Sequence, residues 1–263
     1  MNRVERGRVR AAFSRGAAGY DGRAATQRVV QERVLALLAE IAPSARRVLD
    51  VGAGTGALLR RLRAARPGLA GAAVDLAPGM CAVARAALPG ALVARADAEA
   101  LPFRAGAFDL VVSTSTFQWL AHPGPALAEA RRVLAPGGTF CLALFGARTL
   151  HELREAWRAS AGGAARERLH RFLGPDEVAA ALLASGLRPR AVFEEDVVER
   201  HPDARAVLRS LKAIGASGAV PGARGLGGRA DTLAALRRYD GRHGGPAGVP
   251  ATFHVIYAVA GPS

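Results

Sequence analysis

Between residues 46 and 145 short apolar runs alternate with helical patterns, and this rhythm constrains the fold more than any other feature of the chain. RRVLDVGAGTG predicts a strand that runs into glycines, and LLRRLRAARPG predicts a helix that ends at Pro67-Gly68. Four more strands, each followed or preceded by a helix, repeat the pattern. Such alternation is typical of a Rossmann-like α/β fold, with a mostly parallel sheet and helices on both faces.

After Gly146 the alternation stops. Two further strands are expected at 188–200 and 251–261, which would complete a sheet of seven strands, with helices at 149–160, 174–186, 203–216 and 229–241. The glycine-rich segment 215–228 between the last two helices is expected to be mobile. At the other end, residues 1–44 predict two helices around a break at Gly19-Tyr20-Asp21-Gly22.

Charge and cysteine content bound the class of protein. The net charge is +14, which suits nucleic acid or an acidic protein partner, but the arginines are dispersed along the chain. Lys212 is the only lysine among 36 basic residues, which suggests that this position requires an ammonium group. Cys81 and Cys141 are too few for a disulfide framework or a zinc site. With no signal peptide and no membrane-spanning run expected, we predict a cytoplasmic protein.

The glycine loop and the acids near it predict a ligand site. Gly52, Gly54 and Gly56 alternate directly after a strand, a spacing that differs from the dinucleotide motif and presents N–H groups to an anionic group. Asp50, before the loop, can face a cationic group. Asp75 ends the second strand, where an acid accepts hydrogen bonds from ribose hydroxyls. A ligand with a carboxylate, an ammonium, a ribose and an adenine, such as S-adenosylmethionine, matches this arrangement.

The motifs VLDVGAGTG, VDLAPGM, ADAEALPF and LAPGG, in this order, resemble those of class I S-adenosylmethionine-dependent methyltransferases over roughly residues 46–145. The resemblance implies that the three glycines hold the methionine end of the cofactor and that Asp75 binds its ribose. It further implies that the adenine and the sulfonium side contact the following residues: Leu76, Met80, Asp97, Ala98, Ser113 and Thr114. Many relatives have Ser-Asn where this chain has Ser113-Thr114, so no amide contact is expected there.

Segments outside that core point to one acceptor. AAFSRGAAGYDGRAATQ, FQWLAHP, TLHELREAW, LRSLKAIGA and VPATFHVIYAVA resemble the malonyl-acyl-carrier-protein O-methyltransferases of biotin synthesis, over nearly the whole chain. The resemblance implies a helical lid at 1–44 and a methyltransferase domain at 45–263, with a cofactor-binding core at 45–146 and an acceptor-side cap and closing strands at 147–263. It also implies S-adenosylmethionine as cofactor and an acyl-carrier protein with a malonyl group as partner.

The acceptor would be the free carboxylate of the malonyl thioester, which is ionised at neutral pH and needs no general base. A cationic or hydrogen-bonding group must hold this carboxylate, and a basic rim would suit the acidic carrier protein. We assign no acid or base. The candidates for positioning and binding the acceptor are Tyr20, Arg15, Gln118, Trp119, Thr149 and Lys212. The histidines show no metal-ligand spacing, and we expect no metal.

Two other functions compete with this interpretation. A small-molecule or quinone methyltransferase on the same core would act on an aromatic acceptor without a carrier protein. An RNA-binding methyltransferase-like protein would use the basic surface and bind RNA in a salt-sensitive way. The dispersed arginines and the absence of an RNA-binding appendage count against RNA, so neither nucleic acid nor a membrane is expected as a partner.

Overall fold

A seven-stranded sheet organises the computed structural model, which describes residues 6–160, 170–214 and 229–262. The order of the strands is β3-β2-β1-β4-β5-β7-β6. The first five are parallel, whereas β7 is antiparallel to β5 and β6 is antiparallel to β7. The strands are β1 (Arg47–Val51), β2 (Ala70–Asp75), β3 (Leu92–Arg95), β4 (Phe108–Thr114), β5 (Leu134–Phe145), β6 (Leu187–His201) and β7 (Val249–Pro262). The predicted Rossmann-like, mostly parallel sheet is confirmed.

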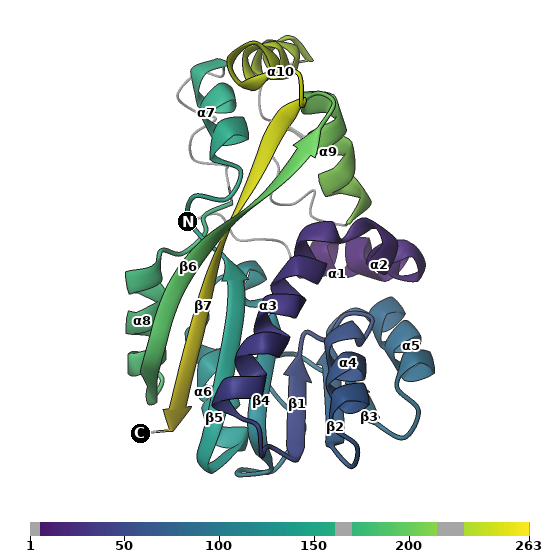
Figure 1. Ribbon diagram of the computed structural model, residues 1–263, viewed down its shortest axis with the longest axis vertical. Helices are drawn as coiled ribbons and strands as arrows, with labels where there is room; N and C mark the ends of the chain where they lie inside the picture. Colours follow the sequence, from purple (N-terminus) through teal and green to yellow (C-terminus); the bar gives the residue numbers. More distant parts are fainter. Residues whose placement is uncertain (1–5, 161–169, 215–228, 263) are drawn as a thin grey trace.

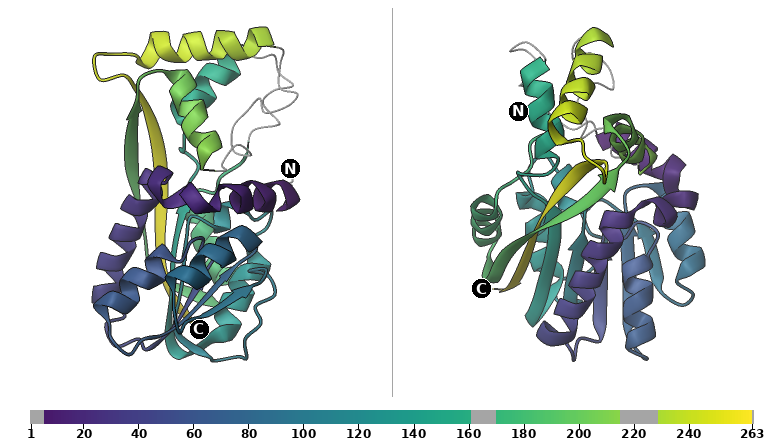
Figure 2. Two further views of the ribbon diagram at one scale, coloured as in Figure 1. Left: turned by 90° about the vertical axis from the view of Figure 1, so that its right-hand side faces the viewer. Right: turned by 45° about the horizontal axis from the view of Figure 1, so that its top comes forward.

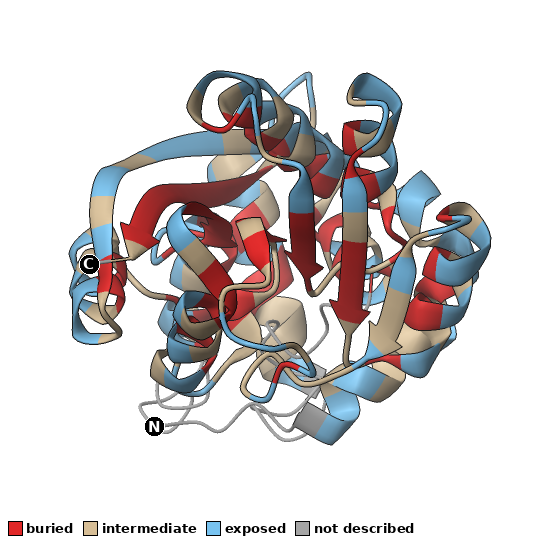
Figure 3. Cartoon of the chain, turned by 90° about the horizontal axis from the view of Figure 1, so that it is seen from below, coloured by how far each residue is buried: buried red, intermediate tan, exposed pale blue. Residues whose placement is uncertain are grey.

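Helices cover both faces of the sheet, and each face has its own hydrophobic cluster (Figures 1 and 3). On one face α3 (Ala25–Ile41), α4 (Ala57–Ala65) and α5 (Pro78–Ala87) contribute Val34, Leu59 and Ala84 to the first cluster. On the other face α6 (Gly124–Val133) and α8 (Pro175–Ala184) contribute Leu127 and Leu182 to the second. Because both faces are covered, the central strands are apolar on both sides.

The two antiparallel strands extend beyond the rest of the sheet. β5 pairs with β7 only over 255–260, whereas β6 pairs with β7 along nearly its whole length. The free end of this ribbon carries α7 (His151–Ser160), α9 (Ala204–Ala213) and α10 (Arg229–His243), which we call the cap (Figures 1 and 2). The cap therefore stands over the carboxyl ends of the parallel strands, where α/β sheets bind ligands.

The N-terminal residues form the other cover of that edge. α1 (Arg6–Gly16), a 3₁₀ turn η1 (Ala17–Gly19) and the one-turn α2 (Tyr20–Arg23) lie across the strand ends (Figure 2). We call residues 6–23 the lid segment. α3 instead packs on the sheet, where Val30, Val34 and Leu38 are buried. The division of the chain at 44 stays a prediction, as does that at 146, and the glycine-rich segment 215–228 lies outside the described residues.

Candidate functional site

A cavity of about 1060 Å³ opens at the carboxyl ends of β1, β2 and β4. It is bounded by the glycine loop, by the segments after these strands and by the lid segment. Eight of the residues predicted to bind the cofactor line it: Gly52, Gly54, Asp75, Leu76, Met80, Asp97, Ala98 and Thr114. The topology brings them together because parallel strands end at one edge of the sheet. We call this space the first cavity.

The three glycines of the loop have different surroundings, although all have positive φ angles. A Cβ on Gly52 would lie 2.1 Å from Oγ1 of Thr116, so this position packs against the segment after β4. A Cβ on Gly54 would meet nothing within 4 Å. A Cβ on Gly56 would lie 2.6 Å from Cδ1 of Leu88. Gly56 does not line the first cavity, and its close approach is to Leu88 at the end of α5, so its contact with the cofactor stays a prediction.

Asp75 joins the glycine loop to the segment after β2. Its Oδ2 accepts a hydrogen bond from the backbone N–H of Gly54 at 2.9 Å, and its Oδ1 accepts one from Ala77 at 2.7 Å. Burial raises the pKa of Asp75 above its usual value, and these hydrogen bonds oppose that shift. The carboxylate therefore fixes the shape of the loop at the wall of the first cavity.

Asp50 is a buried acid without a partner. It is 1% exposed, and neither of its carboxyl oxygens has a hydrogen-bond partner in the described structure. Burial, with the charge of Asp75 nearby, raises the pKa of Asp50 to about 7. Asp50 does not itself line the first cavity, but the next residue, Val51, does. A cationic ligand group nearby would compensate the buried negative charge.

Ser113 lies inside the sheet rather than at the ligand edge. It is fully buried, and its Oγ donates a hydrogen bond to the carbonyl oxygen of Val51 at 2.7 Å. The three residues that follow, Thr114, Ser115 and Thr116, do line the first cavity. Ser115 has a φ of +53°, which is unusual for a residue other than glycine, and its buried hydroxyl has no partner. The polar residues STST at the end of β4 indicate that this part of the chain lines a cavity. They do not show which of the hydroxyls faces it.

The lid segment contacts the first cavity directly. Oγ1 of Thr55 donates to Oδ1 of Asp21 at 2.6 Å, and the N–H of Gly79 donates to Oγ of Ser14 at 2.8 Å. Tyr20 lines the cavity, and burial, together with Asp75 and Asp21, raises the pKa of its hydroxyl. Phe13 and Arg10 of α1 and Gln27 of α3 also line it, and sequence reasoning did not single them out.

A second cavity, of about 420 Å³, adjoins the first. The two share Phe13, Tyr20, Gln27, Ser115 and Trp119 as lining residues. The remaining lining of the second cavity comes from the turn after β4, from the segment after β5, from α9 and from β7: Gln118, Phe145, Thr149, Leu150, Phe172, Leu211, Ile214 and Phe253. None of its lining residues in the described parts of the chain carries a charge.

Gln118 is the most unusual residue of the second cavity. It is 5% exposed, and neither Nε2 nor Oε1 of its amide has a hydrogen-bond partner. An unpaired buried amide costs about 1–3 kcal/mol, so a ligand that bonds to it would be favoured. Thr149 differs, because its Oγ1 already donates to the carbonyl oxygen of His254 at 3.1 Å. Trp119 packs edge-on against Phe13, with ring centroids 5.8 Å apart.

Lys212 and Arg15 lie outside both cavities. Both are exposed, and neither lines the first or the second cavity. The neighbours of Lys212 on α9, Leu211 and Ile214, do face the second cavity. A Cβ on Gly16 would lie 3.8 Å from the carbonyl oxygen of Ala213, so the ends of α1 and α9 adjoin. Lys212 therefore lies on the outer side of the wall of the second cavity.

The described residues offer neither a metal-binding cluster nor a membrane-spanning helix. No group of three or more His, Cys, Asp or Glu side chains in them could hold a metal ion. Nor is any described helix both long and apolar enough to cross a membrane. The site therefore consists of two adjoining cavities with a shared wall. The lining of one includes the charged residues Asp75, Asp97 and Arg10, and the other is lined by uncharged, mostly apolar groups.

Comparison with known proteins gives matches of two kinds. A family model described as a methyltransferase domain matches residues 49–142. The malonyl-[acyl-carrier protein] O-methyltransferase of Geobacter sulfurreducens is 53% identical over 263 aligned residues, which cover 97% of this chain and 98% of that protein. The protein of the same name from Halorhodospira halophila is 40% identical, and the match covers 98% of this chain and 88% of the relative.

Solved structures share the fold at lower identity. One is phosphoethanolamine N-methyltransferase 2 of Haemonchus contortus in complex with phosphomonomethylethanolamine and S-adenosylhomocysteine. It superimposes with a TM-score of 0.54 and 20% identity, and the match covers 88% of this chain and 53% of that chain. At this level of identity the likeness concerns the fold alone.

Proposed function

The chain belongs to the malonyl-[acyl-carrier protein] O-methyltransferase family, and on this basis we propose which ligand each of its two cavities binds. The enzyme is an O-methyltransferase that esterifies the free carboxylate of malonyl-acyl-carrier protein, with S-adenosylmethionine as methyl donor. The products are the malonyl methyl ester, which primes biotin synthesis, and S-adenosylhomocysteine. The observation that carries the proposal is the shared wall between a cavity suited to the cofactor and an uncharged one suited to the acceptor.

The residues of the first cavity fit the cofactor. Asp50 is a buried carboxyl group without a partner, beside the wall of the cavity, and would balance the ammonium of the methionine end. Gly54 leaves open space where a Cβ would otherwise stand. Asp75 would accept hydrogen bonds from the ribose, while Leu76 and Met80 would pack on the adenine. When bound, the cofactor supplies an activated methyl group on a sulfonium.

The edge of the adenine requires both a hydrogen-bond acceptor and a hydrogen-bond donor from the protein. Asp97 and Ala98 line the first cavity beyond Asp75, at the end of β3. The carboxylate of Asp97 already accepts a hydrogen bond from the N–H of Glu99 at 3.0 Å, which orients it. We propose that the carboxylate of Asp97 and the N–H of Ala98 form hydrogen bonds with the edge of the adenine.

The second cavity would hold the malonyl carboxylate through neutral donors. A carboxylate with a pKa of about 4 is ionised at neutral pH, so no general base is required. Of the two kinds of group that could hold it, cationic or hydrogen-bonding, the described lining offers only the second. Nε2 of Gln118 would donate to one carboxylate oxygen and leave the other free to attack the methyl group. Tyr20, which lines both cavities, would keep the two ligands in line.

The uncharged lining has a chemical consequence. The transfer converts an anionic carboxylate and a cationic sulfonium into a neutral ester and a neutral thioether. Charge is therefore smaller in the transition state than in the separated reactants, and an apolar surrounding that excludes water favours its formation. A cation bound tightly to the carboxylate would stabilise the reactant instead, and would slow the transfer.

The acceptor has to reach the second cavity from outside. The lid segment contributes Phe13 and Tyr20 to one side of this cavity, and α9 contributes Leu211 and Ile214 to the other. We propose that the phosphopantetheine arm enters at this seam. Arg15 on α1 and Lys212 on α9 are exposed on the outside of the same elements. They would attract the phosphate of the arm or acids of the carrier protein.

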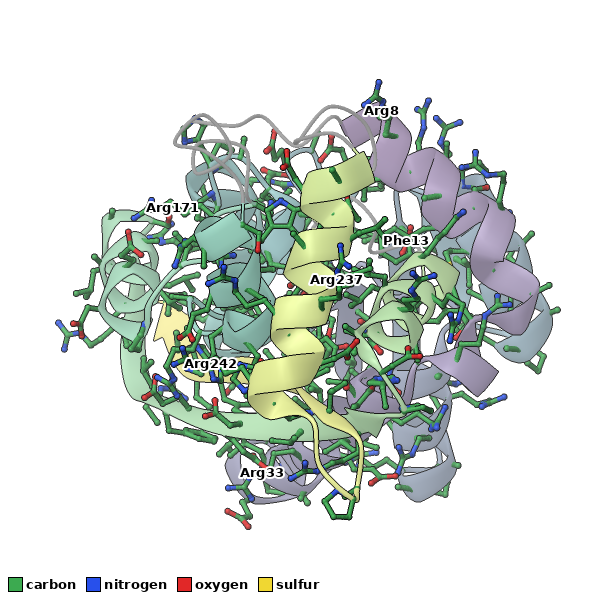
Figure 4. All side chains as sticks on the ribbon, turned by 90° about the horizontal axis from the view of Figure 1, so that it is seen from above. Arg8, Phe13, Arg33, Arg171, Arg237 and Arg242 are labelled. Atoms are coloured by element: carbon green, nitrogen blue, oxygen red, sulfur yellow. The ribbon has the colours of Figure 1, made fainter. Side chains whose placement is uncertain are left out.

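The surface above the seam carries further arginines. Figure 4 shows Arg8 on α1 and Arg237 and Arg242 on α10, around the top of the molecule. α1 contains no acidic residue in its first turn, and its last turn ends with Arg15. A surface of this kind suits an acidic partner, and attraction of this type mainly raises the rate of encounter.

A single mass measurement tests the proposal. The protein is incubated with S-adenosylmethionine and malonyl-acyl-carrier protein, and the intact carrier is weighed. We expect a gain of one methyl group, about 14 Da, and none on acetyl-carrier protein, which lacks the free carboxylate. No gain, with cofactor binding confirmed, would contradict the proposed acceptor. Methylation of a quinone-like compound would then favour the small-molecule alternative, which the six aromatic rings of the second cavity also suit.

A further inference from the structure

A buried histidine outside both cavities holds the turn that carries Gln118. The turn η2 (Phe117–Trp119) follows β4, and the carbonyl oxygen of Gln118 lies 2.7 Å from Nε2 of His170. A carbonyl oxygen can only accept a hydrogen bond, so Nε2 of His170 must carry the proton and donate it. The contact joins residues that are 52 positions apart in the sequence.

The imidazole is itself held in place. His170 is 6% exposed, and its ring centroid lies 5.5 Å from that of Trp119 and 4.6 Å from that of Phe172. Arg154 on α7 donates to the backbone carbonyl of His170 at 2.8 Å, and its guanidinium lies 5.9 Å from the centre of the Phe172 ring. Burial and the charge of Arg154 lower the pKa of His170, which keeps the ring neutral at neutral pH.

The amide of Gln118 needs such support. Both of its polar atoms are buried and unpartnered, and a free turn would rotate to pair or hydrate them. The backbone hydrogen bond to His170 opposes this movement, because the carbonyl of the same residue is anchored. Trp119, the next residue, forms part of the wall between the two cavities, so the same bond also fixes that wall.

We infer that His170 is a positioning residue for the methyl transfer, because its Nε2–H fixes the turn at 117–119 and thereby directs the Gln118 amide at the acceptor carboxylate. This inference rests on the proposed function of the second cavity. His170 touches neither the carboxylate nor the cofactor, and it acts on the acceptor only through Gln118.

Two substitutions of His170 test its hydrogen-bond donor and its aromatic ring separately. His170→Gln retains an N–H near the position of Nε2 but removes the aromatic contacts, whereas His170→Phe retains a ring and removes the donor. We expect His170→Phe to raise the KM for malonyl-acyl-carrier protein about 3- to 10-fold, the range of one lost hydrogen bond. His170→Gln should recover most of this loss. Affinity for S-adenosylhomocysteine, measured by calorimetry, should change less than 2-fold in either variant, which is about the error of such comparisons.

A double-mutant cycle asks whether the effect passes through Gln118. Gln118→Leu removes the amide, and in that background His170→Phe has nothing left to direct. We therefore expect the rise in KM caused by His170→Phe to disappear when Gln118→Leu is present. A residue that only stabilises the fold would give the same factor in both backgrounds. If His170→Phe does not fold, His170→Leu removes the same donor with a smaller side chain.

The possible outcomes are distinct. A His170→Phe variant with unchanged KM, or additive effects in the cycle, would overturn the inference while the wild-type enzyme still methylates the carrier. If His170→Phe is active and His170→Gln is impaired, the effect comes from the ring contacts. That result would also overturn the inference. A wild-type protein that does not methylate malonyl-acyl-carrier protein would instead contradict the proposed function.

Discussion

The hydroxyl of Thr55 donates a 2.6 Å hydrogen bond to the carboxylate of Asp21 and so joins the glycine loop to the lid segment. Thr55 is buried directly after Gly54, and Asp21 belongs to the one-turn helix α2, which begins at Tyr20. Both elements bound the first cavity, where Thr55 and Tyr20 are among the lining residues. We therefore expect this hydrogen bond to slow the exchange of a ligand that enters or leaves past the lid segment.

Removing this hydroxyl should accelerate exchange of the cofactor product. Thr55→Val keeps the shape of the side chain and loses the donor. We expect the dissociation rate of S-adenosylhomocysteine, measured by stopped flow, to rise about 10-fold, since a hydrogen bond to a charged group contributes about 1.5–3 kcal/mol. Asp21→Asn retains an acceptor oxygen and should show a smaller rise. Equal rates in Thr55→Val and the wild-type protein would mean that exchange takes another route.

Binding of the cofactor product should weaken as the pH falls through 7. Burial, with the charge of Asp75 nearby, raises the pKa of Asp50 to about 7, so Asp50 becomes neutral below that pH and no longer attracts an ammonium group. Between pH 8 and pH 6 the affinity for S-adenosylhomocysteine should fall up to about 10-fold. Asp50→Asn should bind weakly at both pH values, with a flat profile. A wild-type profile as flat as that of Asp50→Asn would remove Asp50 from the site.

The stability of the ligand-free protein should depend on pH in the opposite sense. The folded-state pKa of Asp50 lies above that of the unfolded chain, so the folded state binds the proton more tightly. This contribution to stability is present at low pH and is lost as the pH rises through about 7. Asp50→Asn should therefore melt at a higher temperature than the wild-type protein at pH 8, and the difference should shrink at pH 5.5.

A cation placed in the second cavity should slow the chemistry. Leu211 is buried and lines this cavity, where Leu211→Lys would pair with the acceptor carboxylate. We expect a lower KM for the acceptor and a kcat reduced at least about 10-fold, because the lysine would stabilise the charged reactants more than the transition state. Leu211→Gln provides a neutral polar control, and melting curves of both variants verify folding. A kcat that stays constant or rises in Leu211→Lys would show that the uncharged lining does not promote the transfer.

Reversing the charge of Lys212 should affect the carrier-bound acceptor selectively. Lys212→Glu should raise the KM for malonyl-acyl-carrier protein about 3- to 10-fold at low salt and leave the affinity for S-adenosylhomocysteine unchanged. Because Lys212 is exposed, Lys212→Arg should retain the low KM. Arg104 is also exposed but precedes β4, at the opposite edge of the sheet, so Arg104→Glu is the matched control. An equal rise in Lys212→Glu and Arg104→Glu would indicate attraction by net charge alone.

The fold and the cofactor motifs could be predicted because their signals are local. A glycine loop directly after an apolar strand needs positive φ angles, and an acid at the end of the next strand reaches the same edge. Gly54 and Asp75 therefore meet in a hydrogen bond that the topology enforces. The alternation of strands and helices from 46 to 145 specifies the parallel part of the sheet in the same way.

Individual side chains could not be assigned in this manner. Ser113 and Ser115 are two positions apart, yet the first bonds inside the sheet and the second faces the cavities, because the backbone at Ser115 adopts a positive φ angle after the strand ends. Gly54 and Gly56 are likewise two apart, but Leu88 covers only the second. Lys212 stands out in the sequence because it is the only lysine. Its exposure, however, depends on which face of α9 packs inward.

By itself the sequence determined the sheet, the glycine loop and the acids at the strand ends, since each depends on residues that are close in the chain or on the period of a repeating pattern. Packing between distant segments, in contrast, places Gln118, Leu211 and Phe253 around one cavity and brings His170 within hydrogen-bond distance of Gln118. The physical reason is that the cap reaches the sheet through contacts between residues far apart in sequence. Their closeness depends on how the β6–β7 ribbon twists and packs, which no local pattern encodes.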